Sequence, residues 1–171
     1  MDSDIIQDFK EQIIYRLDES VRMITISFDQ LSEEDIWKRF NESSNSIGNL
    51  ILHLCGNITQ YAISSLGNLE DNRDRDAEFS ATDGLSKSEL LTKLTATITK
   101  AKKIINTCST AEYQRKREVQ GFNFSGIGIA IHVTEHLSYH TGQIAFWTKQ
   151  LKNKDLGFYD GMDLNIKNND K

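Results

Sequence analysis

Apolar residues recur in steps of three and four along the first thirty residues, which is the period of an α-helix. The positions are Ile6, Phe9, Ile13, Leu17, Val21, Ile24, Phe28 and Leu31. They predict one long amphipathic helix over residues 2–30. Ser32 and Asp35 then stand at the spacing of a capping box, so a short helical turn through Trp37 is expected.

A second long helix is expected from Asn45 or Ser46, either of which can cap it, to about Leu66. Gly67 is its stop signal. Its apolar stripe consists of Ile47, Leu50, Leu54, Ile58 and Tyr61. Beside the stripe runs a polar seam of Asn49, His53, Asn57 and Gln60. This seam is either a solvated face or the wall of a pocket.

The third helix begins with a capping box at Ser86, and the fourth is expected from about Ser125 to Lys152. The stripe of the third helix is Leu91, Leu94, Ile98, Ala101, Ile105 and Cys108. Residues 68–85 and 109–122 form long polar connections. No stretch alternates with period two, so no strand is expected. The absence of proline fits long uninterrupted helices.

The expected fold class is therefore all-α, a four-helix bundle with long crossover connections. One domain is expected to span residues 1–171. Residues 153–171 form its polar C-terminal tail, in which the aromatic pair Phe158–Tyr159 is able to fold back on the bundle.

Composition narrows the choice of partners and location. The net charge of -5 and pI near 5.4 argue against nucleic acid and anionic membranes, which attract basic faces. No apolar run approaches the ~18 residues that span a membrane. The acidic start Met1–Asp4 leads directly into a patterned helix, so no signal peptide is expected and the location is cytoplasmic. Cys55 and Cys108 are expected to be buried free thiols, and the cluster Arg115–Arg117 to be solvated.

The most informative chemistry is the spacing of the histidines. His132, His136 and His140 stand four residues apart, which places them one turn apart on one helix face. Two imidazoles so placed can direct ring nitrogens at one ion, and a third ligand from another helix leaves an open position for water. The alternative is a buried network of hydrogen-bonded imidazoles without metal, and the spacing alone leaves both open.

His53, His136 and His140 would supply three neutral nitrogens from two helices that can be neighbours in a bundle. His132 is either the third ligand instead or lies outside the ligand shell. The sequence lacks His-Glu-x-x-His, which excludes a metalloprotease, and Glu-x-x-His, which speaks against a di-iron centre. It also lacks Cys-x-x-Cys, so a structural zinc knot is not expected. Haem bound between two histidines of the bundle is a further alternative.

The runs Ser46–Asn57 and His132–Ile144, in this order, resemble the DinB-like superfamily and its DinB/YfiT-like bundle. The closing run Asp155–Tyr159 resembles a subgroup long known as a domain of unknown function. The resemblance covers nearly the whole chain. Many relatives carry an arginine after the last histidine, where this sequence has Thr141.

The resemblance implies a divalent metal, zinc or nickel and one per chain, held by His53, His136 and His140. It also implies a homodimer. Better understood relatives are transferases and isomerases that depend on low-molecular-weight thiols such as bacillithiol or mycothiol.

Two functions are therefore expected. One is a metal-dependent transferase or hydrolase that acts on a small electrophile, with a low-molecular-weight thiol as a partner molecule. The other is a non-catalytic metal-binding or stress-related binding protein on the same bundle. Candidates for orienting ligands or substrate are Asn49, Asn57, Glu135 and Gln143, with His132 beside the ligands.

Overall fold

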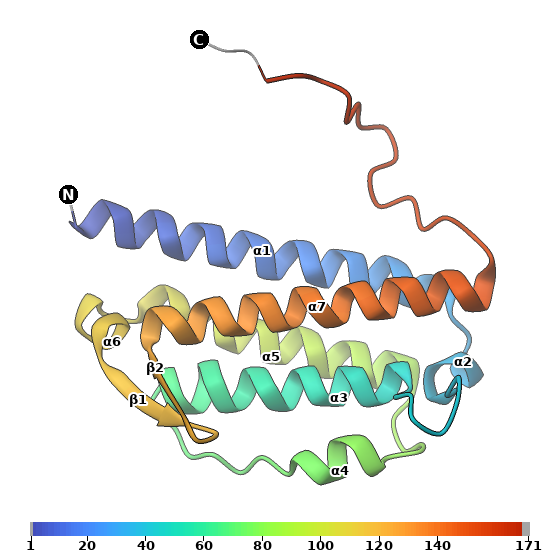
Figure 1. The fold of residues 1–171 in the computed structure, drawn as a ribbon, viewed down its shortest axis with the longest axis horizontal. Coiled ribbons are helices and arrows are strands. Elements are labelled where there is room, and N and C mark those ends of the chain that lie inside the picture. The colour runs from blue at the N-terminus through green and yellow to red at the C-terminus, as the bar shows by residue number, and fades with distance from the viewer. Residues whose placement is uncertain (1, 169–171) are drawn as a thin grey trace.

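Four long helices form a bundle in the computed structural model, which describes residues 2–168 (Figure 1). They are α1 (Asp2–Gln30), α3 (Ile47–Ile58) with its continuation η1 (Thr59–Leu66), α5 (Lys87–Thr107) and α7 (Gly126–Lys152). Both α1 and α3 pack against α5 and α7. In Figure 1, α1 and α7 run in one direction and α3 and α5 in the other, so the link from α3 to α5 crosses the length of the bundle. The all-α bundle with a long crossover is confirmed.

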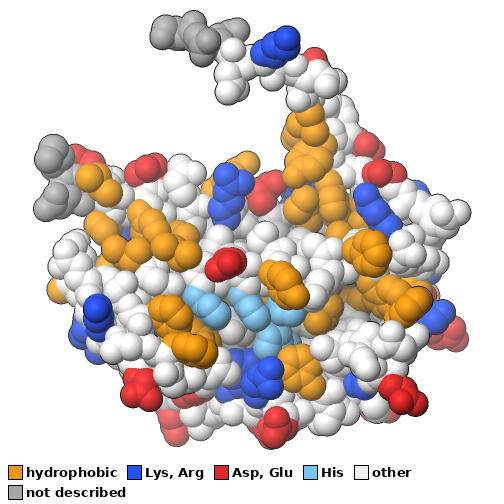
Figure 2. Space-filling model, in the orientation of Figure 1, with side chains coloured by type: hydrophobic (Ala, Val, Ile, Leu, Met, Phe, Trp, Pro, Cys, Tyr) orange, Lys and Arg blue, Asp and Glu red, His pale blue; other side chains and the backbone are white. Residues whose placement is uncertain are grey.

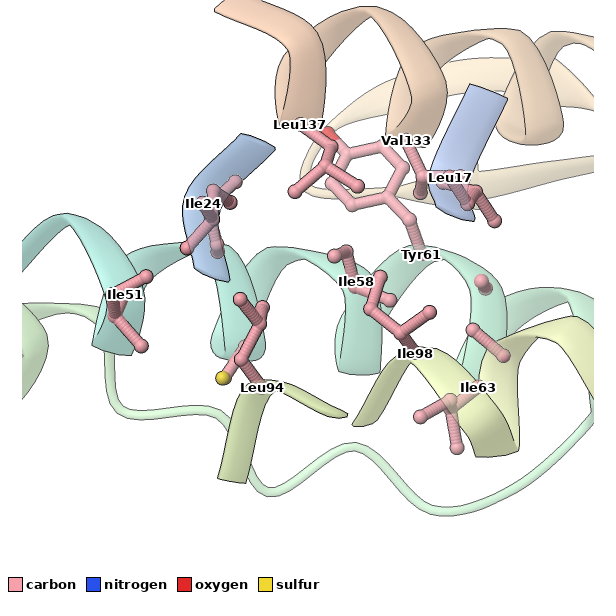
Figure 3. Packing of buried hydrophobic residues seen from close by; sticks show 14 of the residues in the cluster. Leu17, Ile24, Ile51, Ile58, Tyr61, Ile63, Leu94, Ile98, Val133 and Leu137 are labelled. Atoms are coloured by element: carbon pink, nitrogen blue, oxygen red, sulfur yellow. The ribbon is translucent and has the colours of Figure 1, made fainter. Parts of the chain in front are cut away.

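The apolar stripes of the four helices meet in one buried cluster (Figure 3). Its central side chains are each at most 4% exposed and include Leu17, Ile24, Ile51, Ile58, Tyr61, Ile63, Leu94, Ile98, Val133 and Leu137. Burying one such aliphatic side chain contributes about 1.5–3 kcal/mol. Leu54 and Leu137 belong to this cluster and directly follow His53 and His136 in sequence. The core packing therefore fixes the rotation of α3 and α7 that brings these two histidines to one side.

Side-chain caps set the helix starts where the sequence predicts them. Ser32 and Asp35 form the capping box of α2 (Glu33–Trp37), and Ser46 forms one with Asn49 at the start of α3. Ser86 caps α5, and the Ser125 hydroxyl accepts from Gly128 N at the start of α7. Each cap contributes about 1 kcal/mol by satisfying an N–H that has no partner within the helix.

The second helix widens into a π-helix from Thr59, which the sequence pattern does not indicate. A π-helix adds residues per turn and so rotates its side chains relative to the stripe of α3. Tyr61 is buried in this segment, and its hydroxyl donates to Gln120 Oε1 at 3.0 Å. η1 ends at Gly67, as predicted.

The connection between α3 and α5 contains the short helix α4 (Arg75–Ser80). Asp74 caps it by accepting from Ala77 N at 3.0 Å. The Asn49 amide donates to the carbonyls of Glu78 at 3.0 Å and Ala81 at 2.7 Å, which fastens α4 to the start of α3. A helix this short is not stable alone, so tertiary contacts rather than local pattern create it.

The connection between α5 and α7 contains α6 (Thr110–Gln114) and an antiparallel hairpin of β1 (Lys116–Val119) and β2 (Phe122–Ser125). The expectation of no strand is therefore wrong. Gln120 and Gly121 at the turn both have positive φ, 53° and 79°, as a tight hairpin turn requires.

Arg117 explains why the hairpin is hidden in the sequence. It takes an inward position of β1 and is 8% exposed, so the buried positions of the strand do not read as an apolar alternation. Its guanidinium donates to the carbonyls of Ser65 at 3.0 Å and Glu112 at 2.8 Å. The expectation that this basic cluster is wholly solvated is wrong for Arg117.

The tail returns to the bundle before it leaves. Leu156 is buried, and the Phe158 carbonyl accepts from Arg22 Nη1 at 3.0 Å. Figure 1 shows the later part of the described tail extending away from the helices. Cys55 and Cys108 are both free, the first buried and the second half-buried. Within residues 2–168, no helix combines the length and the apolar character that crossing a membrane requires.

Candidate metal centre

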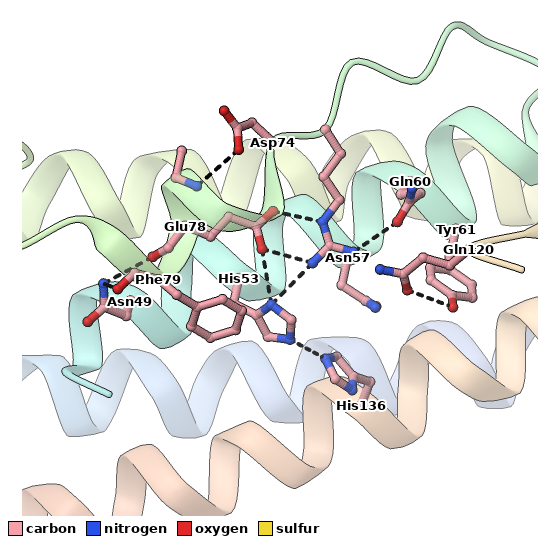
Figure 4. Close-up of polar contacts among 12 residues, drawn as sticks. Asn49, His53, Asn57, Gln60, Tyr61, Asp74, Glu78, Phe79, Gln120 and His136 are labelled. Carbon is pink, nitrogen blue, oxygen red and sulfur yellow. Dashed lines mark hydrogen bonds and ion pairs between the residues drawn. The ribbon is translucent and has the colours of Figure 1, made fainter. Parts of the chain in front are cut away.

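Three histidines from two helices direct ring nitrogens at one point. His53 comes from α3, His136 and His140 come from α7, and one nitrogen of each lies within 4.8 Å of the others. Nε2 of His53 and Nε2 of His136 are 2.9 Å apart (Figure 4). Zn–N bonds of ~2.0–2.1 Å in a tetrahedron place ligand nitrogens about 3.3 Å apart. The cluster is therefore within small side-chain movements of a metal-binding geometry.

The cluster lies at the surface, although its rings are largely buried. His53 is 6% and His140 8% exposed, whereas His136 is half-buried. Figure 2 shows the histidine side chains gathered in the middle of one face with hydrophobic side chains around them. A pocket of about 300 Å³ opens there and is lined by His132, Glu135, His136 and Tyr139. A small molecule can therefore reach the edge of the cluster from solvent.

The environment keeps His136 and His140 neutral. Burial, together with the neighbouring His140 and His53, lowers the pKa of His136 to about 3. Burial also lowers the pKa of His140, although its hydrogen bond to Gln143 opposes the change. Only a neutral imidazole has the nitrogen lone pair that binds a metal ion. The protonation states of His136 and His140 therefore suit a divalent cation.

Gln143 orients His140. Its Oε1 lies 2.6 Å from His140 Nδ1, and an amide oxygen can only accept. Nδ1 therefore carries the proton, and the lone pair is left on Nε2. This is the arrangement in which the other ring nitrogen of a metal-binding histidine usually donates to an oxygen. Gln143, which the sequence offers as a candidate for orienting ligands or substrate, thus contacts a candidate ligand.

Glu78 and Arg73 contact His53, and sequence reasoning missed both. Glu78 Oε2 lies 3.0 Å and Arg73 Nη2 3.1 Å from His53 Nδ1. The two side chains also form an ion pair, with Arg73 Nε 2.7 Å from Glu78 Oε1 and Arg73 Nη2 2.8 Å from Glu78 Oε2 (Figure 4). Glu78 is 8% exposed. Burial alone would raise its pKa, but the hydrogen bonds from Arg73 and His53 outweigh burial and lower it.

Gly56 makes room for this carboxylate. A Cβ at position 56 would overlap Glu78 Oε1, so only glycine lets α4 approach α3 this closely. The run Glu70–Asp76, with its alternating charges, and a glycine inside a helix pattern are the signals in the sequence. Neither points to His53, because Glu78 lies 25 residues away in a connection without periodicity.

His132 stands beside the cluster and not within it. Its ring stacks between Tyr61, at 4.1 Å between centroids, and His136, at 5.4 Å. Its Nε2 accepts from Asn57 Nδ2 at 3.3 Å. Asn57 Oδ1 is buried and has no hydrogen-bond partner in the part of the chain that is described. The structure therefore brings His132 and Asn57 together as a support for His136.

The two remaining polar candidates occupy different places. Asn49 bonds to the start of α3, to Arg39 and to α4, so it acts on the cluster only by holding α4. Glu135 is exposed at the mouth of the pocket beside His136. Aromatic rings complete the surroundings, with Phe79 4.7 Å from His53 and Tyr139, 62% exposed, 4.9 Å from His140.

Comparison with known proteins agrees with this fold. The family described as "Protein of unknown function (DUF1572)" matches residues 4–159. Among solved structures, the DinB-like protein YjoA from Bacillus subtilis is similar with a TM-score of 0.66 and 16% identity, over 86% of this chain and 96% of that chain. At this identity the likeness establishes the fold alone. No curated protein matches the chain. The DinB-like fold that the sequence resemblance implies is confirmed, and the matching family is one of unknown function.

Proposed function

We propose that this chain, which belongs to the DUF1572 family of DinB-like proteins, binds one divalent metal ion through His53, His136 and His140. The observation that carries the proposal is the convergence of three ring nitrogens within 4.8 Å. A metal ion satisfies three lone pairs at once, whereas the 2.9 Å bond between His53 and His136 joins only two rings. Zinc or nickel is the proposed ion because imidazole ligands suit both.

The proposed activity is that of a metal-dependent transferase or hydrolase acting on a small electrophile, with a low-molecular-weight thiol as the donor in the transferase case. Three protein ligands leave one coordination position open. A metal ion held by the three histidines would supply Lewis acidity and would lower the pKa of a coordinated water or thiol. Glu135 lines the pocket beside His136 and is the proposed proton acceptor, and the rings of Phe79 and Tyr139 lie against His53 and His140.

A second candidate is a non-catalytic metal-binding or stress-related binding protein. Thr141 favours it, because the resemblance leads us to expect an arginine at this position. The Thr141 side chain is buried, and its hydroxyl donates to the Leu137 carbonyl at 2.7 Å within α7. It therefore offers no charge to a substrate.

Metal uptake is tested by calorimetric titration of metal-free protein with zinc and with nickel. Wild type should bind one ion per chain, and His136→Ala should lose more than about 100-fold in affinity because a ligand is gone. His132→Ala is the matched control, since it removes a neighbouring imidazole but no proposed ligand. Equal affinity of His136→Ala and wild type would remove the basis of the proposal.

The choice between the two candidates needs an activity panel of thiol cofactors with electrophiles and hydrolysable esters and amides. Turnover that requires added metal and disappears in His136→Ala supports the enzyme. Stoichiometric metal binding without turnover across the panel supports the binding protein.

We also propose a homodimer in the cytoplasm. Support for the dimer comes from large apolar side chains exposed along α7, namely Ile131, Tyr139 and Phe146, at 49%, 62% and 64%. Light scattering at micromolar concentration should return twice the 19.5 kDa chain mass. A mass equal to one chain would contradict the dimer.

A further inference from the structure

We infer that Glu78 is a positioning residue that fixes His53 in the tautomer with its proton on Nδ1, and that it does so against the competing donor Arg73. The inference rests on the proposed metal site, because the role of this tautomer is to leave the lone pair of Nε2 facing His136 and His140.

The two neighbours of His53 Nδ1 require opposite hydrogen-bonding roles of this nitrogen. Glu78 Oε2, at 3.0 Å, can only accept a hydrogen bond, and Arg73 Nη2, at 3.1 Å, can only donate one. With the proton on Nδ1, His53 donates to Glu78 and Nε2 is free to bind a metal. With the proton on Nε2, Nδ1 accepts from Arg73 and no lone pair faces the cluster. The ring can satisfy only one of these neighbours at a time.

The other hydrogen bonds of Arg73 decide which tautomer of His53 is favoured. Its guanidinium already donates to Glu78 at 2.7 and 2.8 Å and to Gln60 Oε1 at 2.9 Å. It therefore has little need of an acceptor on His53. The carboxylate has lone pairs to spare, and an imidazole lone pair facing it would be repelled. With the proton on Nδ1, Glu78 accepts from His53, and Arg73 gives up only its contact with the ring while it keeps its bonds to Glu78 and Gln60. Glu78 therefore sets this tautomer for as long as its ion pair with Arg73 holds.

Contacts between α4 and α3 hold the Glu78 carboxylate beside His53. Asn49 fastens α4 through the carbonyls of Glu78 and Ala81, and Gly56 leaves the space that the carboxylate occupies. With His53 protonated on Nδ1, the 2.9 Å contact between the two Nε2 atoms requires that His136 donate in the metal-free protein. The metal-free state should therefore hold His53 protonated on Nδ1 and His136 protonated on Nε2.

The test is ¹⁵N NMR of histidine-labelled, metal-free protein, in which long-range ¹H–¹⁵N correlations distinguish the two tautomers. Wild type should show His53 with the Nδ1 proton, and Glu78→Gln should shift it toward the Nε2 proton, because Arg73 then lacks its ionic partner. Asp76→Asn, which removes an exposed carboxylate from the same helix, is the control and should leave the tautomer unchanged.

Zinc affinity is the second readout. Glu78→Gln should lose about 10- to 100-fold in affinity, the usual effect of removing a partner of a ligating histidine. Adding Arg73→Met to Glu78→Gln removes the competing donor and should restore part of that loss, whereas a merely structural role for Glu78 would give no recovery. Thermal unfolding of each variant confirms that it is folded.

Two results would overturn the inference. One is wild-type His53 with its proton on Nε2, and the other is Glu78→Gln with wild-type tautomer and affinity. If the wild-type chain takes up neither zinc nor nickel, the proposed function fails, while the tautomers of the metal-free protein still decide the role of Glu78.

Discussion

Replacing Gly56 by alanine should have two opposite effects on the free energy of unfolding. The higher helix propensity of alanine raises it, and disruption of the ion pair between Glu78 and Arg73, which contacts His53, lowers it. Gly56 lies inside α3, where alanine is favoured over glycine by about 1 kcal/mol. A Cβ there would overlap the Glu78 carboxylate and lie 2.9 Å from Arg73 Nε. Because Arg73 and His53 both hold the carboxylate, it cannot move aside without losing hydrogen bonds.

The loss should exceed the gain. A hydrogen bond to a charged group contributes about 1.5–3 kcal/mol, and displacing the carboxylate breaks at least one. Gly56→Ala is therefore expected to lower the free energy of unfolding by about 0.5–2 kcal/mol. Gly142→Ala is the matched control, because a Cβ there meets nothing within 4 Å in the interior of α7. It should raise the free energy of unfolding by about 1 kcal/mol.

The assay is urea unfolding of the metal-free proteins, followed by circular dichroism, with a zinc titration of each folded variant. Gly56→Ala should be the less stable variant and bind zinc more weakly, and Gly142→Ala should bind zinc as wild type does. If Gly56→Ala gains as much stability as Gly142→Ala, the close approach of Glu78 to α3 does not constrain the protein and the reasoning is refuted.

Two further outcomes are expected. Zinc at 100 times its Kd should add about 2.7 kcal/mol to the free energy of unfolding and raise Tm by about 5–10 °C. A chelator should reverse both changes. An unchanged Tm would count against a metal site that forms only in the folded chain. The pKa of His136 is lowered to about 3 in the folded protein, so the unfolded chain binds more protons below its own pKa of about 6.5. The metal-free protein should therefore be most stable above pH 6.5 and lose up to about 1.4 kcal/mol per pH unit from this residue as the pH falls toward 5, and urea midpoints of His136→Asn should show a shallower loss.

Much of the bundle can be read from the sequence because its determinants are local. Apolar residues at helical spacing and serine caps such as Ser46 and Ser86 act within one or two turns, so the helix starts fall where the pattern places them. The spacing of His136 and His140 likewise fixes their common face. His53 could also be assigned to the same site, because the resemblance implies one ligand from the second long helix and two from the fourth.

The rest depends on contacts between distant segments. Arg117 fills an inward strand position through carbonyls of Ser65 and Glu112, which no alternation of apolar residues reveals. Glu78 reaches His53 only because α4 docks on Asn49. Such polar contacts leave no period in the sequence, so the hairpin and the support behind the candidate ligand could not be predicted.

X-ray absorption spectroscopy of the zinc-loaded chain observes the proposed ligands themselves. We expect one zinc per chain with three imidazole nitrogens at about 2.0–2.1 Å and one further light ligand. The imidazole scattering should fall in His53→Ala and His140→Ala and stay unchanged in His132→Ala. Zinc bound with fewer than two imidazoles, or a spectrum that none of these substitutions alters, would contradict the proposed metal site.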